Sequence, residues 1–124
     1  LTAEVYGMTR SARETIELFW KTQDDRDYTR LVELFAEDAV LVDPIYGTFE
    51  GREAIAAFMA RMNEEMGGQQ IEFDLVEAAG GGEVAWAQWE ARTPAGLRRG
   101  VGIYRVRDGL LTYYRDYMNP LGEG

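Results

Sequence analysis

Apolar residues recur at helical spacing through the first half of the chain. Ser11 and Glu14 form a capping box that predicts the start of one helix. Asp27 is placed to cap a second helix, and Gly51 opens a third that the pair Gly67-Gly68 would end. The three apolar stripes are Ile16, Phe19 and Trp20; Leu31, Leu34 and Phe35; and Ile55, Phe58, Met59, Met62 and Met66.

In the second half, apolar and polar residues alternate instead. The alternation predicts strands at residues 71–75, 83–92, 98–107 and 110–118, after a shorter strand at 39–43 that Pro44 ends. Glycine-rich turns separate the strands, and Asp108-Gly109 is typical of a two-residue hairpin. Helices followed by antiparallel hairpins predict one α+β domain over residues 1–124, with the helices on one face of a curved sheet.

The composition narrows the possible chemistry. The 124 residues include no cysteine and no histidine, which excludes disulfides, Cys/His zinc sites, catalytic cysteine and histidine-dependent acid–base mechanisms. A net charge of −9 argues against a nucleic acid partner. No apolar run approaches the roughly 20 residues that a membrane span needs. The first residues carry no signal-peptide pattern, so a cytoplasmic location is expected.

Two carboxylates stand out from the strand periodicity. Glu90 shares a strand face with Trp86 and Gln88, and Asp116 shares one with Tyr114. If these faces turn toward the helices, both acids enter an apolar cavity, where burial and mutual repulsion would separate their pKa values into one acid and one base. Simpler interpretations stay open. Glu90 would then face solvent, Asp116 would join an ion pair beside Arg115, and Asp43 would form a turn.

Several segments resemble the SnoaL-like branch of the nuclear transport factor 2-like superfamily. They are residues 35–39, 42–44, 47 and 51–55 and, near the end of the chain, 105–111 and 114–117. The resemblance implies a cone in which a strongly curved, mostly antiparallel sheet wraps around about three helices and a deep apolar pocket. It also implies a homodimer formed through the outer face of the sheet.

Three chemistries of this superfamily fall on residues of this chain. The two acids of limonene epoxide hydrolase-like enzymes fall on Glu90 and Asp116, although Gln88 stands where those enzymes have a bridging arginine. The aspartate base of ketosteroid isomerase-like enzymes falls on Asp43, but their hydrogen-bond donors fall on Phe19 and Gly102, which cannot donate from a side chain. The acid–base aspartate of SnoaL-type polyketide cyclases is similar to Asp116, and those cyclases use no metal or cofactor.

We therefore expect a cofactor-independent enzyme of cyclase or isomerase type that acts by carboxylate acid–base catalysis on a small apolar or polycyclic substrate. Asp116 is the expected acid–base residue, Glu90 its partner and Asp43 a second candidate base. Gln88 and Tyr114 would orient a substrate oxygen or a water. The expected pocket wall is Phe19, Trp20, Phe58, Met62 and Trp86. A limonene-type epoxide hydrolase and a non-catalytic ligand-binding or dimerisation module are the alternatives.

Overall fold

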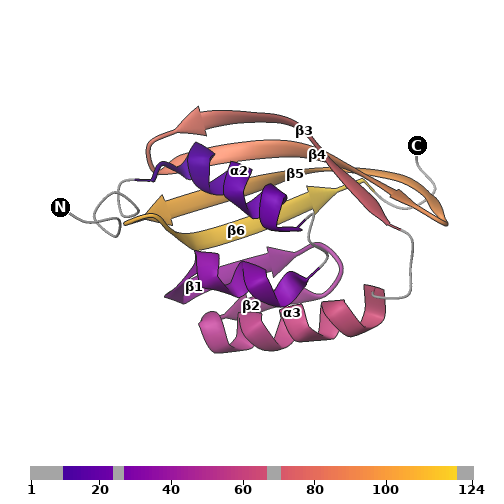
Figure 1. Cartoon of the computed structure of the whole chain (residues 1–124), viewed down its shortest axis with the longest axis horizontal. Coiled ribbons are helices and arrows are strands. Elements are labelled where there is room, and N and C mark those ends of the chain that lie inside the picture. Colours follow the sequence, from indigo (N-terminus) through magenta and orange to yellow (C-terminus); the bar gives the residue numbers. More distant parts are fainter. Residues whose placement is uncertain (1–9, 24–26, 67–70, 120–124) are drawn as a thin grey trace.

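Helices lie on one side of a six-stranded sheet in the computed structural model, which describes residues 10–23, 27–66 and 71–119 (Figure 1). The helices are α2 (Ala12–Gln23), the 3-10 helix η1 (Tyr28–Leu34) and α3 (Arg52–Met66). The strands are β1 (Phe35–Asp43), β2 (Gly47–Glu50), β3 (Glu72–Gly81), β4 (Val84–Thr93), β5 (Gly96–Arg107) and β6 (Leu110–Met118). The predicted α+β architecture is confirmed.

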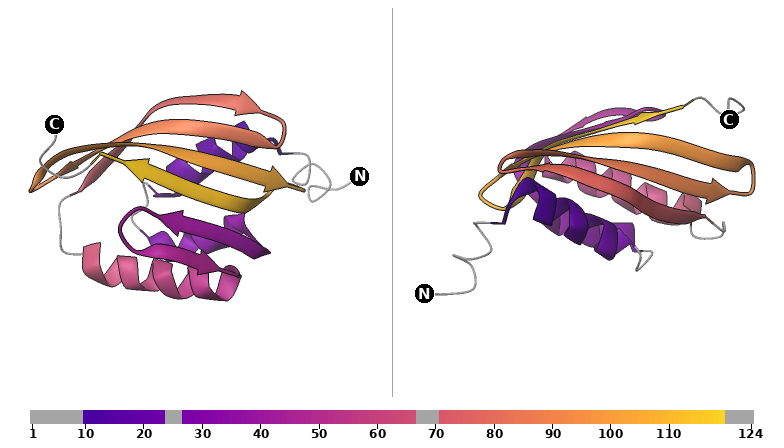
Figure 2. Two further views of the ribbon diagram at one scale, coloured as in Figure 1. Left: turned by 180° about the vertical axis from the view of Figure 1, so that it is seen from behind. Right: turned by 90° about the horizontal axis from the view of Figure 1, so that it is seen from above.

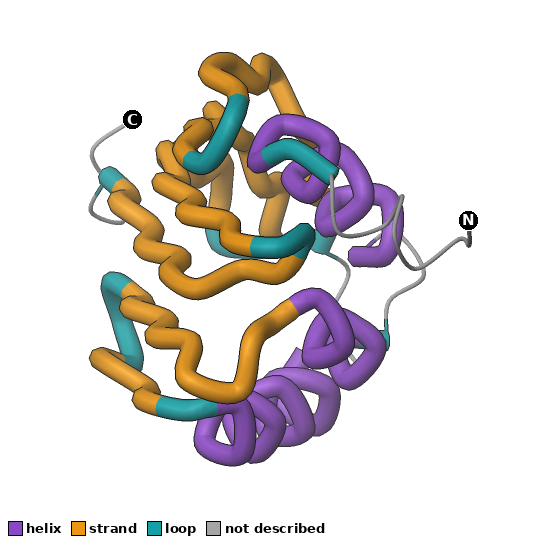
Figure 3. Tube along the Cα trace, turned by 90° about the vertical axis from the view of Figure 1, so that its left-hand side faces the viewer, coloured by secondary structure: helices purple, strands orange, loops and turns teal. Residues whose placement is uncertain are grey.

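The strand order across the sheet is β2-β1-β6-β5-β4-β3. Only β1 and β6 run parallel, and every other neighbouring pair is antiparallel. The sheet is curved and unclosed, and both α-helices cover its concave face (Figure 2). Viewed from the end, the helices and strands form two separate layers (Figure 3). Helix α2 contacts β3 to β6, whereas α3 contacts β1 and β2.

The predicted helix starts are confirmed by their capping contacts. The backbone N–H of Ser11 donates to Glu14 Oε1 at 2.9 Å, and the N–H of Glu14 donates to Ser11 Oγ at 3.1 Å. Asp27 accepts the N–H of Thr29 at the start of η1. The predicted stop at Gly67-Gly68 lies outside the described residues. No helix in the described ranges is long and apolar enough to cross a membrane.

The strands differ from the prediction chiefly at three places, one of which is β3, which runs over Glu72–Gly81 and is twice as long as the predicted strand at 71–75. Phe35 was predicted to extend the helical stripe of Leu31 and Leu34, but its backbone is already extended and it begins β1. Strand β2 pairs with β1, and the sequence pattern did not predict it because Phe49 is the one large apolar residue among its four. The predicted hairpin at Asp108-Gly109 is confirmed, since both residues have positive φ.

The two faces of β4 are opposite to the expectation. Ala85, Ala87, Trp89 and Ala91 are buried toward the helices. Trp86, which lies on the other face, is 48% exposed, so its predicted place in the pocket wall is wrong. The small alanine side chains let α2 pack closely against β4. That a second copy of the chain covers the exposed outer face stays a prediction.

Candidate functional site

Asp116 lies on β6 directly opposite Gly102 on β5, and its side chain is on the concave face. A Cβ atom at position 102 would lie 2.9 Å from Asp116 Oδ1, so only glycine leaves room for the carboxylate there. Gly100 has the same function for the indole of Trp89, which a Cβ at position 100 would overlap. Alternate glycines on β5 therefore create the space in which the acid and the indole meet.

The carboxylate of Asp116 is held by two neutral donors. Trp89 Nε1–H donates to Oδ1 at 3.1 Å, and the hydroxyl of Tyr114 donates to Oδ2 at 2.5 Å. Burial raises the pKa of Asp116 to about 7, the two hydrogen bonds oppose that rise, and the negative charge of Asp43 adds to it. Among the described residues no cation pairs with Asp116, so its charge is stabilised by dipoles alone.

A second polar layer lies beneath Asp116. The ring of Tyr114 stacks on that of Tyr104 at 4.5 Å between centroids, and Trp20 Nε1–H donates to the Tyr104 hydroxyl at 3.1 Å. Burial raises the pKa of both tyrosines, so both keep their protons near neutral pH. Tyr114 therefore acts as a hydrogen-bond donor to the carboxylate and not as a base. Tyr114 was predicted to orient substrate. Its hydroxyl instead contacts Asp116, and Tyr114 is not among the residues that line the cavity.

A cavity of about 240 Å³ opens over Asp116. Figure 1 shows that the ends of β1, α3 and β6 and the start of β5 meet at one end of the molecule, and residues of these ends line the cavity. The apolar part of its wall includes Met62, Met66, Ile71, Phe73, Trp89 and Met118. The ionisable groups in the wall are Asp43, Tyr46, Glu65, Arg98 and Asp116. An apolar chamber with a few convergent polar groups is typical of a small-molecule site.

Asp43 both forms a turn and lines this cavity. Its Oδ2 accepts the backbone N–H groups of Ile45 and Tyr46, each at 2.9 Å. Parallel pairing of β1 with β6 sets Val42 opposite Arg115 and so brings Asp43 to the level of Asp116. The cavity wall therefore holds Asp43 and Asp116, two of the three predicted acids, together with Glu65, which was not predicted.

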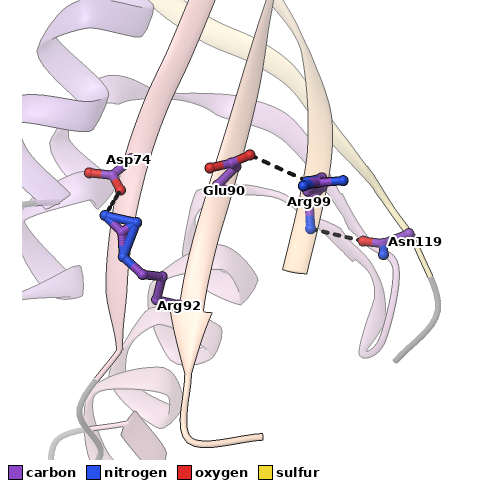
Figure 4. Close-up of polar contacts among 5 residues, drawn as sticks. All are labelled: Asp74, Glu90, Arg92, Arg99 and Asn119. Atoms are coloured by element: carbon purple, nitrogen blue, oxygen red, sulfur yellow. Dashed lines mark hydrogen bonds and ion pairs between the residues drawn. The ribbon is translucent and has the colours of Figure 1, made fainter. Parts of the chain in front are cut away.

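Glu90 is the third predicted acid, and it lies on the outer face of the sheet. Its carboxylate pairs with Arg99 Nε at 3.3 Å, next to a second ion pair between Asp74 and Arg92 (Figure 4). The predicted meeting of Glu90 and Asp116 in one cavity is therefore corrected, because consecutive β4 residues alternate faces and Trp89 occupies the inner one. Gln88 shares the outer face with Glu90 and is exposed, so it cannot orient a molecule in the cavity.

Of the predicted wall residues on the concave side, Met62 lines the cavity. Phe19 and Trp20 pack behind it in the aromatic core, and Phe58 stacks on Phe49 at 4.3 Å. Trp89, Phe73 and Arg98 line the cavity but were missed. The signal for Trp89 and Arg98 was available, because Trp89 shares its strand face with three alanines and Arg98 shares one with Gly100 and Gly102. Among the described residues no three acidic side chains gather as a metal site would require.

The amino-acid sequence matches one protein family, and the structure is similar to several solved structures. The family model of the SnoaL-like domain matches residues 16–114. No curated protein matches by sequence. A protein from Kribbella flavida DSM 17836 has a similar structure, with a TM-score of 0.73, 21% identity and coverage of 87% of this chain and 86% of its own. These values show a shared fold.

Two further solved structures are named by an activity. An M. tuberculosis epoxide hydrolase of the LEH-like type is similar with a TM-score of 0.68 and 19% identity, over 87% of this chain and 82% of its own. A protein from Sinorhizobium meliloti, named as a candidate polyketide cyclase, is similar with a TM-score of 0.69 and 17% identity, over 84% of this chain and 94% of its own. The same fold thus carries more than one chemistry.

Proposed function

Because the chain belongs to the SnoaL-like domain family, we propose that it is a small-molecule enzyme in which Asp116 transfers protons to and from an apolar substrate. The observation that carries the proposal is one carboxyl group, with a pKa of about 7, in the wall of a largely apolar cavity. A carboxyl with that pKa is divided between its acid and base forms near neutral pH, which is where general acid–base catalysis is most effective.

The proposed reaction starts at a carbon next to a carbonyl group. The Asp116 carboxylate accepts a proton from that carbon, the electron pair of the C–H bond forms a C=C bond, and the π pair of the carbonyl group moves to the oxygen to give an enolate. In a substrate with a β,γ C=C bond, Asp116 then returns the proton to the γ-carbon as the carbonyl group re-forms, which moves the double bond and isomerises the substrate. In a cyclisation, the enolate carbon instead attacks a second carbonyl of the same molecule and Asp116 protonates the new alkoxide. Trp89 and Tyr114 hold the carboxylate in one orientation throughout.

The cavity favours a small substrate. Its volume of about 240 Å³ is below the roughly 300–1,000 Å³ typical of sites for drug-sized ligands. Of the two expected substrate classes, the small apolar molecule therefore fits better than the polycyclic one. We also propose that the negative charge of Asp43, a further carboxylate in the cavity wall, raises the pKa of Asp116 and so makes its carboxylate a stronger base.

Epoxide hydrolysis is the second candidate. The presence of Asp43 and Asp116 in one cavity favours it, since opening an epoxide needs one carboxylate to activate water and one carboxyl to protonate the epoxide oxygen. The position of Glu90 on the outer face counts against the pairing that the family resemblance implied.

Deuterium exchange separates these functions. In D₂O, the protein is expected to accelerate exchange at the α-carbons of cyclohexanone and 4-phenyl-2-butanone, followed by NMR. Asp116→Asn is expected to lose roughly 100-fold or more of that acceleration, and Glu90→Gln to keep it. Diol release from cyclohexene oxide would favour the hydrolase instead.

A titration tests the proposal without a substrate. The indole N–H signal of Trp89 reports the protonation of Asp116, to which it is hydrogen-bonded. A midpoint near pH 7 supports the proposed role. A midpoint near the ordinary aspartate value of about 4 would contradict it and would favour a ligand-binding module.

A further inference from the structure

Arg98 is the cation in the cavity wall. It lies on β5 opposite Ala91 of β4, on the concave face, and its NH1 donates to the thioether sulfur of Met118 at 3.4 Å. A thioether is a weak acceptor and occupies one of the five guanidinium donors. No described carboxylate forms an ion pair with Arg98.

The neighbouring arginines behave differently. Arg99, the next residue, pairs with Glu90 on the outer face, and Arg92 pairs with Asp74. Among the described residues the one hydrogen bond of Arg98 is to a thioether, so it differs from these two arginines by lining the cavity without a carboxylate partner. The side chain is only partly exposed, so water does not solvate it as fully as a surface arginine.

The carboxylates of the cavity already have donors of their own. Glu65 accepts from Arg61 at 2.7 Å and from the hydroxyl of Tyr46 at 3.0 Å. Asp43 accepts two backbone N–H groups, and Asp116 accepts from an indole and a phenol. None of them is bonded to Arg98. The guanidinium therefore has donors available in the cavity wall beside Met118, two residues along β6 from Asp116.

We propose that Arg98 binds an ionised carboxylate of the substrate, so that the substrate class is a small apolar acid whose opposite end lies at Asp116. This proposal rests on the function proposed above and names its substrate class. Asp116 faces Gly102, and Arg98 is four residues further along β5, or roughly 13 Å of strand. The Arg98 side chain shortens that span, because its NH1 reaches Met118, which is two residues from Asp116 along β6, or roughly 7 Å of strand.

The charges of the cavity also fix the direction of binding. A carboxylate at the Asp116 end would meet two negative groups, whereas at the Arg98 end it meets a planar donor that accepts carboxylates in a two-point contact. The acidic group is thereby kept away from the catalytic carboxylate. The apolar part of the substrate is left beside Phe73 and Trp89, and Asp116 faces its reacting carbon.

Binding of a matched pair of ligands tests this inference without turnover. The pair is 3-phenylpropanoate and its neutral amide, 3-phenylpropanamide, titrated by NMR at neutral pH. The Met118 methyl signal reports the Arg98 end, and the Trp89 indole signal reports the Asp116 end. The acid is expected to move both signals and to bind roughly 10- to 100-fold more tightly than the amide.

Variants assign the effect to Arg98. Arg98→Gln is expected to lower affinity for the acid to that for the amide, and Arg98→Lys to restore part of it because the charge returns without the planar fork. Arg99→Gln removes the same charge from the outer face and is expected to leave both affinities unchanged. Retained dispersion of the NMR spectrum shows that each variant is folded.

Three results would overturn the inference. The amide binds as tightly as the acid, or Arg98→Gln keeps the preference for the acid, or Arg99→Gln loses it to the same extent. Failure of the proposed function is a different result. In that case Asp116→Asn leaves deuterium exchange unchanged, while binding of 3-phenylpropanoate still depends on Arg98.

Discussion

The two faces of the sheet surround their acids in different ways. On the concave face, Asp116 accepts hydrogen bonds from two uncharged groups, and burial raises its pKa to about 7. On the outer face, Glu90 pairs with the guanidinium of Arg99, whose side chain is 57% exposed. An acid compensated by a cation remains a solvated ion pair, whereas an acid held by neutral dipoles keeps its proton to higher pH. Proton transfer near neutral pH needs the second arrangement.

The same contrast separates two adjacent arginines. Arg98 and Arg99 differ only in which face of β5 they occupy, yet one lines the cavity and the other pairs with Glu90. Alternation along a strand thus divides identical residue types between the cavity wall and the outer surface.

The largest expected effect is a pH dependence of stability that Asp116 creates. Its folded-state pKa of about 7 is above the unfolded value near 4, so the folded state holds an extra proton between these values. Stability is therefore expected to fall as pH rises from about 4 to about 7, by on the order of 4 kcal/mol. Urea unfolding at several pH values measures this fall.

Asp116→Asn removes the titrating group, so the free energy of unfolding of the variant should not fall in this way. Relative to wild type, the variant should therefore become more stable as pH rises from about 4 to about 7. Parallel pH profiles for the two proteins would show that the concave face does not desolvate Asp116.

The next effect concerns the space that β5 leaves for the site. Gly100→Ala would drive a methyl group into the indole of Trp89, and overpacking of this kind costs about 1–3 kcal/mol. The expected result is lower stability in urea and a shifted Trp89 indole signal.

Gly81→Ala is the matched control, because a Cβ at position 81 meets no atom within 4 Å. It is expected to leave the free energy of unfolding nearly unchanged. Equal losses in both variants would mean that the cost comes from the backbone and not from the indole.

The sequence predicted the fold better than the site. Capping at Ser11, the hairpin at Asp108-Gly109 and the strand alternation are local signals, and local energetics decides them. The choice of Asp116 also rested on strand periodicity, and the structure places its side chain in the cavity wall. A local signal suffices where one residue and its neighbours determine the outcome.

The choice of face was not local. Both faces of β4 carry a tryptophan, so alternation alone leaves their orientation open, and the expectation that Glu90 enters the cavity also puts Trp86 and Gln88 on the inner face. Packing decided otherwise, because three alanines in the row of Trp89 admit α2. The wrong choice of inner face misplaced Glu90, Gln88 and Trp86 together, because residues two apart on a strand share a face. Phe35 was misread for a similar reason, because its helical spacing from Leu31 hid the start of β1.

A smaller effect tests the contact between Tyr114 and Asp116. The hydroxyl of Tyr114 stabilises the ionised carboxylate, so Tyr114→Phe is expected to raise the pKa of Asp116 by about one unit. The titration of the Trp89 indole signal measures the change. Tyr117→Phe is the outer-face control, since Tyr117 is 48% exposed and stacks with Arg115. A similar shift in both variants, or a fall in the pKa of Asp116, would contradict the assigned contact.

The smallest effect is expected for Glu90→Gln. The variant loses an ion pair with Arg99 that is largely open to solvent, which is worth about 0–1 kcal/mol. It also removes the repulsion between Glu90 and Asp74, which lie directly opposite each other on β4 and β3. The two changes oppose each other, so urea unfolding should show almost no difference from wild type, and deuterium exchange should be unchanged. A large loss of exchange in this variant would connect the outer face to the chemistry and remove the distinction between the two acids.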